Sequence, residues 1–244
     1  GNRLYTAGGF DGTLDIWTYA RSGRRGDFGS RVKVPDPVSV DEANDFCPTP
    51  LTGGWLLFVS NRADGCGRTD MYLARYNPEG LEPASDSAVN LGCYPDGPNT
   101  TGSELSPSLV MTSEGAMLYF STDVSGTQDI YRSEMSIDGS FGPGALVAGV
   151  NTAAFHDQQP NVSKDGLEMV FSSNRDGTQD VFSASRSSLG APWTNVRNLT
   201  MELGLPTVDG NETRASMSWD RKRLYYGSAG TIFVSERKPG HNPQ

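Results

Sequence analysis

The strongest constraint on this chain of 244 residues is a phrase that recurs along it five times. Each copy has one apolar run, a turn rich in Gly, Asp and Asn, and a second apolar run, as in "SSNRDGTQDVF" from Ser172. The residue that opens the second run is Asp15, Asp70, Asp129, Asp180 and, in the last copy, Thr231. These positions lie 51 to 59 residues apart. Such a period belongs to a repeat architecture and not to one isolated hairpin.

The two apolar runs of each copy are predicted to be the strands of a β-hairpin. They are short, rich in β-branched and aromatic residues, and bounded by turn formers. The Asp-Gly and Asn-Arg-Asp-Gly turns supply the positive φ values and the side-chain hydrogen bonds that close such hairpins. The Asp at the head of the second strand is expected to bond backbone amides of its turn. The predicted hairpins lie near residues 3–20, 55–76, 117–134, 168–185 and 222–237.

A second shared element precedes four of the hairpins, namely an acid three residues before a proline or alanine. The four acids are Asp45, Glu104, Asp157 and Glu212. Weaker segments between the blocks, such as "PGALVAGVN", are suited to exposed edge strands, which makes four strands per repeat. No segment has a convincing helical period. The sequence therefore predicts an all-β fold, a single five-bladed β-propeller of four-stranded blades that spans residues 1–244.

The two end copies are incomplete, and this suggests how the predicted ring closes. The first copy lacks its acid-x-x-Pro strand, and the fifth lacks a trailing edge strand. Closure by mixed termini is therefore expected, with the C-terminal "RKPGHNPQ" as a closing piece.

Composition excludes some classes of partner. The formal net charge is −9 and the isoelectric point is near 4.7, whereas a nucleic-acid binder carries a basic stripe. No apolar stretch approaches the roughly 18–20 residues that a membrane span needs. We expect a monomer that binds no nucleic acid and has no membrane span.

The repeat resembles the WD40-like β-propeller repeat of the Tol-system periplasmic propeller, oligopeptidase propeller domains and bacterial envelope proteins. The family phrase is roughly E-x-x-P-x-x-S-x-D-G-x-x-L-x-F-x-S-x-R-x-G-x-x-D-I-Y. The segments "ELSPSLVMTSEGAMLYFSTDVSGTQDIY" and "DQQPNVSKDGLEMVFSSNRDGTQDVF" match it almost position for position. The resemblance covers nearly the whole chain and implies the fold, but the repeat serves scaffolding, gating and catalysis alike.

In a propeller of this kind the first strand of each blade lines the central axis, so the four acids are expected around one mouth of the channel. A ring of carboxylates there is a candidate site for a divalent cation such as calcium, and Asp45, Glu104, Asp157 and Glu212 are its candidate ligands. The alternative is structural, because in the family the same acid often caps backbone amides between neighbouring blades. His156, beside Asp157, and Arg214, beside Glu212, are further candidates for ligand binding.

Two classes of function remain open from the sequence. The first is an exported or envelope-associated binding module that presents its acidic mouth to a protein or carbohydrate ligand. The second is a hydrolase or lyase, directed at carbohydrates or lactones, that uses the carboxylates and His156. No nucleophile elbow, zincin motif or phosphate loop is present, so no catalytic residue is assigned.

The chain has three cysteines, and any single disulfide leaves one of them over. Propeller topology brings Cys66 and Cys93 to the same face at the seam between adjacent blades, so we predict that these two form a disulfide. Such a bond favours an oxidising compartment, periplasmic or extracellular. Cys47, close to Asp45, is then expected to be a buried thiol.

Overall fold

The computed structural model of the chain describes residues 3–10, 12–23, 26–77, 82–83, 87–208 and 210–236. They form five antiparallel sheets, the blades of a five-bladed β-propeller, which confirms the predicted all-β fold class. The helices in these ranges are the five-residue α1 (Leu199–Leu203) and the 3-10 turn η1 (Thr52–Gly54). No helix among the described residues is long and apolar enough to cross a membrane.

The chain divides into two compact units, Gly1–Pro107 and Ser108–Gln244. Each unit has a hydrophobic core of its own. Buried residues such as Ile16, Leu56 and Phe58 form the core of the first unit. In the second unit one core cluster includes Phe171 and Phe182, and another includes Tyr226. That residues 1–244 form a single domain stays a prediction.

The first unit contains the first two blades. One sheet has the strand order β1-β2-β3 and the other has the order β4-β5-β6-β7, with β8 also paired to β6. The strands are β1 (Arg3–Gly8), β2 (Asp15–Ala20), β3 (Val32–Lys33), β4 (Asp45–Pro50), β5 (Trp55–Ser60), β6 (Asp70–Asn77), β7 (Glu82–Pro83) and β8 (Val89–Asn90).

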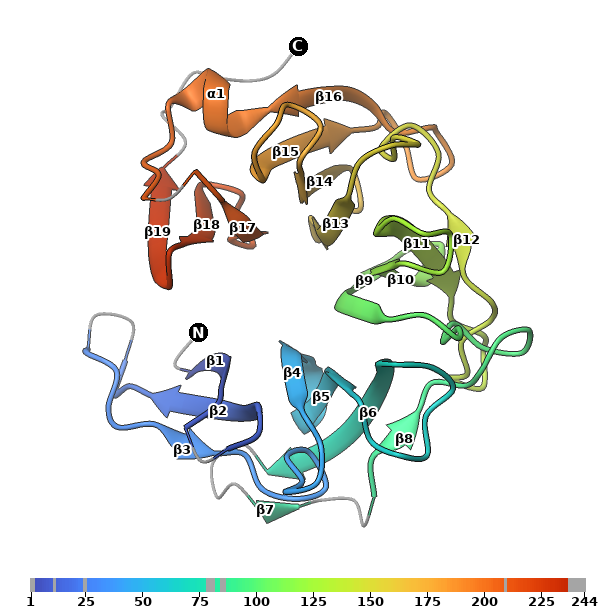
Figure 1. Ribbon diagram of the computed structural model, residues 1–244, viewed down its shortest axis with the longest axis vertical. Coiled ribbons are helices and arrows are strands. Elements are labelled where there is room, and N and C mark those ends of the chain that lie inside the picture. Colours follow the sequence, from blue (N-terminus) through green and yellow to red (C-terminus); the bar gives the residue numbers. More distant parts are fainter. Residues whose placement is uncertain are drawn as a thin grey trace. The chain divides into compact units, whose positions relative to one another are not determined.

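The other three blades belong to the second unit, although residues 104–107 at the start of β9 fall in the first. Figure 1 shows β13, β14, β15 and β16 side by side in chain order, which is the order of a simple antiparallel meander. The strands are β9 (Glu104–Thr112), β10 (Gly115–Thr122), β11 (Asp129–Glu134), β12 (Ala145–Leu146), β13 (Asp157–Val162), β14 (Glu168–Ser173), β15 (Asp180–Ser185), β16 (Thr194–Asn198), β17 (Thr213–Met217), β18 (Arg223–Ser228) and β19 (Thr231–Glu236).

The five central hairpins share one register, which shows that they are equivalent parts of one repeat. The last pair before each turn is Gly8↔Asp15, Ser60↔Asp70, Thr122↔Asp129, Ser173↔Asp180 and Ser228↔Thr231. Side chains alternate between the two faces of each strand, so aromatic residues meet across the hairpins. The rings of Phe171 and Phe182 stack with centroids 5.8 Å apart. Blade packing therefore follows from the β-branched and aromatic runs of the sequence.

The end blades have fewer strands than the middle ones. Among the described residues the first and last sheets have three strands, and the third and fourth have four. Within the described ranges the first sheet starts with β1 and the last ends with β19, as the incomplete end repeats of the sequence indicate. The "RKPGHNPQ" segment proposed for ring closure, residues 237–244, lies outside the described residues.

Candidate functional site

The four acids singled out from the sequence lie at the same end of their blades. Each stands at or directly before the start of the first strand, level with the turn of the central hairpin. We call this the acid end of a blade and the other the far end. The side chains of Asp45, Glu104, Asp157 and Glu212 are all fully buried. None of these carboxylates is presented to solvent.

Asp157 is held within its own blade by an arginine and by the chain that leads into β13. Its Oδ1 accepts a hydrogen bond from Nη2 of Arg175, the arginine of the "SSNRDG" turn. Its Oδ2 accepts hydrogen bonds from the backbone N–H and the hydroxyl of Thr152, the latter at 2.7 Å. The guanidinium of Arg175 in turn lies over the ring of Phe182, 4.9 Å from its centroid. A buried carboxylate is thus compensated by a charge and by hydrogen bonds, as burial requires.

Asp45 repeats this arrangement in the first unit. Its Oδ1 accepts from Arg62 Nη2 at 2.8 Å, and its Oδ2 accepts from the backbone N–H of Val40 at 2.9 Å. Arg62 also donates to the carbonyl of Val38 at 3.0 Å and lies over the ring of Tyr72. Sequence reasoning assigned this arginine only to the turn and missed that it pairs with the acid.

A signal for the arginine partners was present in the repeat. The two blades that begin with Asp have an arginine at the second position after the last hairpin pair. The two blades that begin with Glu have Val124 and Gly230 at that position. The carboxylate of Glu104 instead accepts from the Thr100 hydroxyl at 2.6 Å, and Glu212 accepts from Ser228 at 3.4 Å. The identity of the acid and the presence of arginine therefore vary together along the chain.

The backbone next to each acid joins one blade to the blade before it. The N–H of Asp157 donates to the carbonyl of Gln128 at 2.7 Å, and the N–H of Gln128 donates to Nδ1 of His156 at 3.1 Å. We call this two-bond contact the interblade clasp. In the first unit, Asp45 donates to the Leu14 carbonyl at 2.6 Å, and Leu14 donates to Oδ1 of Asn44 at 2.9 Å.

His156 therefore has a structural contact and is itself an exposed residue. Because Nδ1 accepts a hydrogen bond, the proton of the neutral imidazole is assigned to Nε2. Phe155, its neighbour, is 39% exposed. Arg214 is also exposed, and its backbone N–H donates to Oε1 of Gln159 at 2.8 Å, which places β17 beside β13. His156, Phe155 and Arg214 are thus exposed at the acid end of the second unit, together with turn residues such as Val124 and Asp176.

A left-handed residue interrupts the first strand of four blades, two positions after the acid. These residues are Cys47, Ser106, Gln159 and Arg214, with φ values between 51° and 59°. The strand register shifts at this point in the blades of Cys47, Gln159 and Arg214, as it does at a β-bulge. Non-glycine residues in this conformation are uncommon and cluster at functional or tightly constrained sites. Of the four, the sequence singled out only Arg214 for ligand binding.

The predicted disulfide between Cys66 and Cys93 is present, with Cα atoms 5.5 Å apart. It lies beside Asp70, whose Oδ2 accepts a hydrogen bond from the N–H of Cys66 and another from Asn90. Burial raises the pKa of the Asp70 carboxyl, and these hydrogen bonds oppose the rise. Cys47 is a buried thiol that takes no part in the disulfide, and its Sγ lies 3.5 Å from the hydroxyl of Ser106.

The hairpin aspartates have partners other than the expected turn amides in three of four blades. Asp70 does bond a turn amide. Asp129 accepts from the hydroxyl of Thr127 at 3.3 Å, Asp180 accepts from Asn198 at 2.7 Å, and Asp15 pairs with Lys33 at 2.9 Å. Hydroxyl, amide and ammonium groups thus take the place of backbone donors.

No group of three or more His, Cys, Asp and Glu side chains in the described part of the chain is arranged to hold a metal ion. That Asp45, Glu104, Asp157 and Glu212 bind a divalent cation such as calcium stays a prediction. The contacts above account for the burial of Asp45 and Asp157 through arginine and backbone donors.

Comparison with known proteins gives the fold class and no family. No protein-family model matches the chain, and no curated protein matches it. Among solved structures it is similar to TolB from Acinetobacter baumannii, with 12% identity and a TM-score of 0.58 over 96% of this chain and 50% of that one. It is also similar to a GH43 endo-arabinanase from Bacillus licheniformis, with 15% identity and a TM-score of 0.57 over 97% of this chain and 90% of the other.

An endo-arabinase from Bacteroides thetaiotaomicron is similar as well, with 16% identity and a TM-score of 0.58 over 98% and 91% of the two chains. The chain thus spans half of the TolB chain and about nine tenths of each arabinanase. Identities this low show a shared fold alone, and the fold is compatible with both classes of function that the sequence leaves open.

Proposed function

We propose that this chain is an exported β-propeller binding module that holds a protein or carbohydrate ligand at the acid end of its blades. His156 and Arg214 are the proposed contact residues. The observation that carries the proposal is the burial of all four acids, two of which are ion-paired with arginines of their own blades. Glycoside hydrolysis needs two carboxyl groups that flank the bond to be cleaved. His156, Arg214 and Phe155 are exposed at the acid end of the second unit, and their imidazole, guanidinium and phenyl groups suit contact with a ligand.

The disulfide supports the exported location. Disulfides persist in oxidising compartments and are rare in the cytosol. The similarity to TolB is compatible with an exported location. It shows a shared fold and identifies no binding partner.

An array of glycans and peptides probed with the labelled chain tests the proposal. The test variant carries both His156→Asn, which keeps a hydrogen-bond acceptor for the clasp, and Arg214→Gln. The matched control is Lys222→Gln, which removes one charge from an exposed side chain of the same unit. We expect spots that the wild type and the control bind and the double variant does not. Spots that all three proteins bind equally would exclude the acid end as the binding surface.

Release of reducing ends from linear arabinan tests the alternative, a carbohydrate-directed hydrolase. If the chain cleaves arabinan and Asp157→Asn abolishes cleavage in a folded protein, the hydrolase is correct and the binding module is wrong.

The predicted cation is tested separately, by melting the protein with and without a chelator and then adding back Ca²⁺, Mg²⁺, Mn²⁺ and Zn²⁺. Binding of an ion at 100 times its Kd stabilises the folded state by about 2.7 kcal/mol.

A further inference from the structure

A second surface feature lies at the far end of the third and fourth blades, within the second unit. Two cavities of about 310 Å³ and 300 Å³ open there, and both are lined by Arg132 and Glu134 of β11. We call the pair the far-end groove. The first lobe lies between β10 and the loop that carries Leu189, and the second extends toward Pro143. Each lobe has the size of a small ligand pocket.

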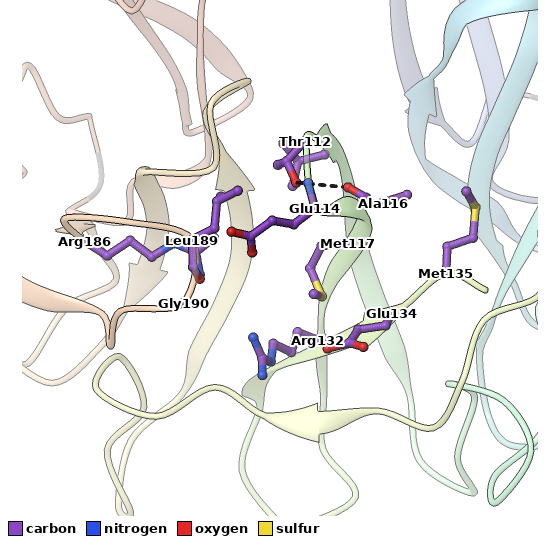
Figure 2. Close-up of a pocket in the computed structure, with 12 residues that line it drawn as sticks. Thr112, Glu114, Ala116, Met117, Arg132, Glu134, Met135, Arg186, Leu189 and Gly190 are labelled. Carbon is purple, nitrogen blue, oxygen red and sulfur yellow. Dashed lines mark hydrogen bonds between the residues drawn. The ribbon is translucent and has the colours of Figure 1, made fainter. Parts of the chain in front are cut away.

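The strand register explains why apolar and charged side chains meet in the first lobe. Met117 pairs with Glu134, and Arg132 lies two residues before Glu134 on the same strand. Side chains two positions apart share a face of the sheet, so Met117, Arg132 and Glu134 are on one face. Figure 2 shows Met117, Arg132 and the carboxylate of Glu114 directed into the space that faces Leu189 and Gly190.

A buried arginine holds the opposite wall in place. Arg186 is 9% exposed, and it donates to the carbonyls of Gly166 and Leu189, each at 2.7 Å. Its guanidinium lies over the Trp193 ring, 4.5 Å from the centroid. These contacts occupy the Arg186 guanidinium and hold the loop in place, so this wall of the groove is preformed. Arg132 is then the arginine that can bind an anionic group of a ligand.

The charged groups of the groove have no ion-pair partner among the described residues. Arg132, Glu114 and Glu134 form no salt bridge there, although the chain forms several such pairs elsewhere. Apolar atoms of Val110, Ala116 and the thioethers of Met117 and Met135 surround them. Methionine walls adapt to aliphatic side chains of different shapes. The groove thus offers one cation, two anions and an adaptable apolar lobe.

We infer that the far-end groove binds the C-terminal end of a peptide that has an aliphatic last residue and a basic residue shortly before it. The terminal carboxylate is bound by Arg132, because charge-assisted bonds from arginine to carboxylate are strong. The last side chain enters the lobe of Met117 and Leu189, and the basic residue meets Glu114, whose carboxylate is directed into the same space. None of the described lining residues is aromatic, so a sugar ring finds no stacking face in the groove.

Fluorescence polarisation with the labelled tetrapeptide Gly-Lys-Gly-Leu tests the inference. We expect Arg132→Met to weaken binding about tenfold or more, and the C-terminal amide of the peptide to bind equally weakly to the wild type. If Arg132 contacts the terminal carboxylate, the losses from Arg132→Met and from the C-terminal amide are not additive. The amide peptide then binds the wild type and Arg132→Met with the same affinity. Glu114→Gln weakens the lysine peptide more than a peptide with alanine in place of lysine.

Two controls separate this site from the acid end. Lys222→Met removes one exposed cation outside the groove, and it leaves the affinity for the peptide unchanged. The variant with His156→Asn and Arg214→Gln also leaves it unchanged, so the inference and the proposed function succeed or fail separately. Equal affinity for the acid and amide peptides overturns the inference, and so does peptide binding that Arg132→Met does not weaken. Absence of peptide binding at millimolar concentration, or binding of linear oligosaccharides in the groove instead, overturns it as well.

Discussion

At the scale of single residues, His156 and Asn44 perform the same task with different side chains. Each lies directly before a buried aspartate and accepts a hydrogen bond from a backbone N–H of the preceding blade, at 3.1 Å and 2.9 Å. Nδ1 of histidine and Oδ1 of asparagine occupy similar places relative to the backbone. Asparagine can therefore replace His156 in the interblade clasp, and what distinguishes His156 from Asn44 is its imidazole ring on an exposed residue.

Substitution of His156 tests whether histidine and asparagine are equivalent in the interblade clasp. We expect His156→Asn to leave the free energy of unfolding nearly unchanged, because the clasp keeps its acceptor. His156→Leu leaves the N–H of Gln128 without that partner and costs about 1 kcal/mol. Urea unfolding followed by tryptophan fluorescence measures both values. An equal loss for the two variants would show that the imidazole, and not its acceptor, stabilises the fold.

The ion pair of Asp157 and Arg175 offers a larger effect. Arg175→Met leaves a buried carboxylate without its cation, and we expect a loss of about 3–5 kcal/mol. Arg175→Met together with Asp157→Asn recovers part of that loss, because no charge then remains buried. The exposed pair of Arg197 and Glu202 is the control, and Arg197→Met costs less than about 1 kcal/mol. Comparable losses for the two arginines would contradict a special role for the buried pair.

At the scale of the strand, the left-handed residue after each acid is the least ordinary feature. Ser106 has φ of 51°, a conformation in which a side chain costs energy and glycine does not. We expect Ser106→Gly to keep or raise stability by up to about 1 kcal/mol, and Ser106→Val to lower it by about 1–2 kcal/mol. Ser235→Gly, in the ordinary strand β19, should lower stability instead, and urea unfolding of all three variants measures the contrast. A loss with Ser106→Gly equal to that with Ser235→Gly would rule out backbone strain at this position.

The strands themselves followed from the sequence, but the bulges and the arginine pairs did not. Alternating apolar runs and Asp-Gly turns are local signals, so the hairpin around Asp180 could be predicted from its own residues. The conformation of Ser106 or Gln159 depends on how the first strand meets the second, and neither residue is a glycine that would indicate positive φ. The pairing of Arg175 with Asp157 joins positions 18 residues apart, and only comparison between repeats reveals it.

At the scale of the whole molecule, the chain consists of two compact units with separate cores, and each unit has its own acid-end contacts. The interblade clasp at Asn44 belongs to the first unit, and the clasp at His156 belongs to the second. Their backbone hydrogen bonds recur with similar lengths although the side chains differ. Stability is therefore distributed over repeated local contacts, as in other repeat proteins.

The single disulfide breaks this equivalence, because both of its cysteines lie in the first unit. It closes a loop with a sequence separation of 27 residues, which contributes about 3–4 kcal/mol in the chain-entropy model. Replacement of Cys66 and Cys93 by serine should therefore accelerate hydrogen exchange in β5 and β6 by opening of the first unit. Exchange in β14 and β15 of the second unit should stay close to that of the wild type. Hydrogen exchange measured by mass spectrometry tests this prediction. An equal loss of protection in both hairpins would contradict it and would mean that the two units open together.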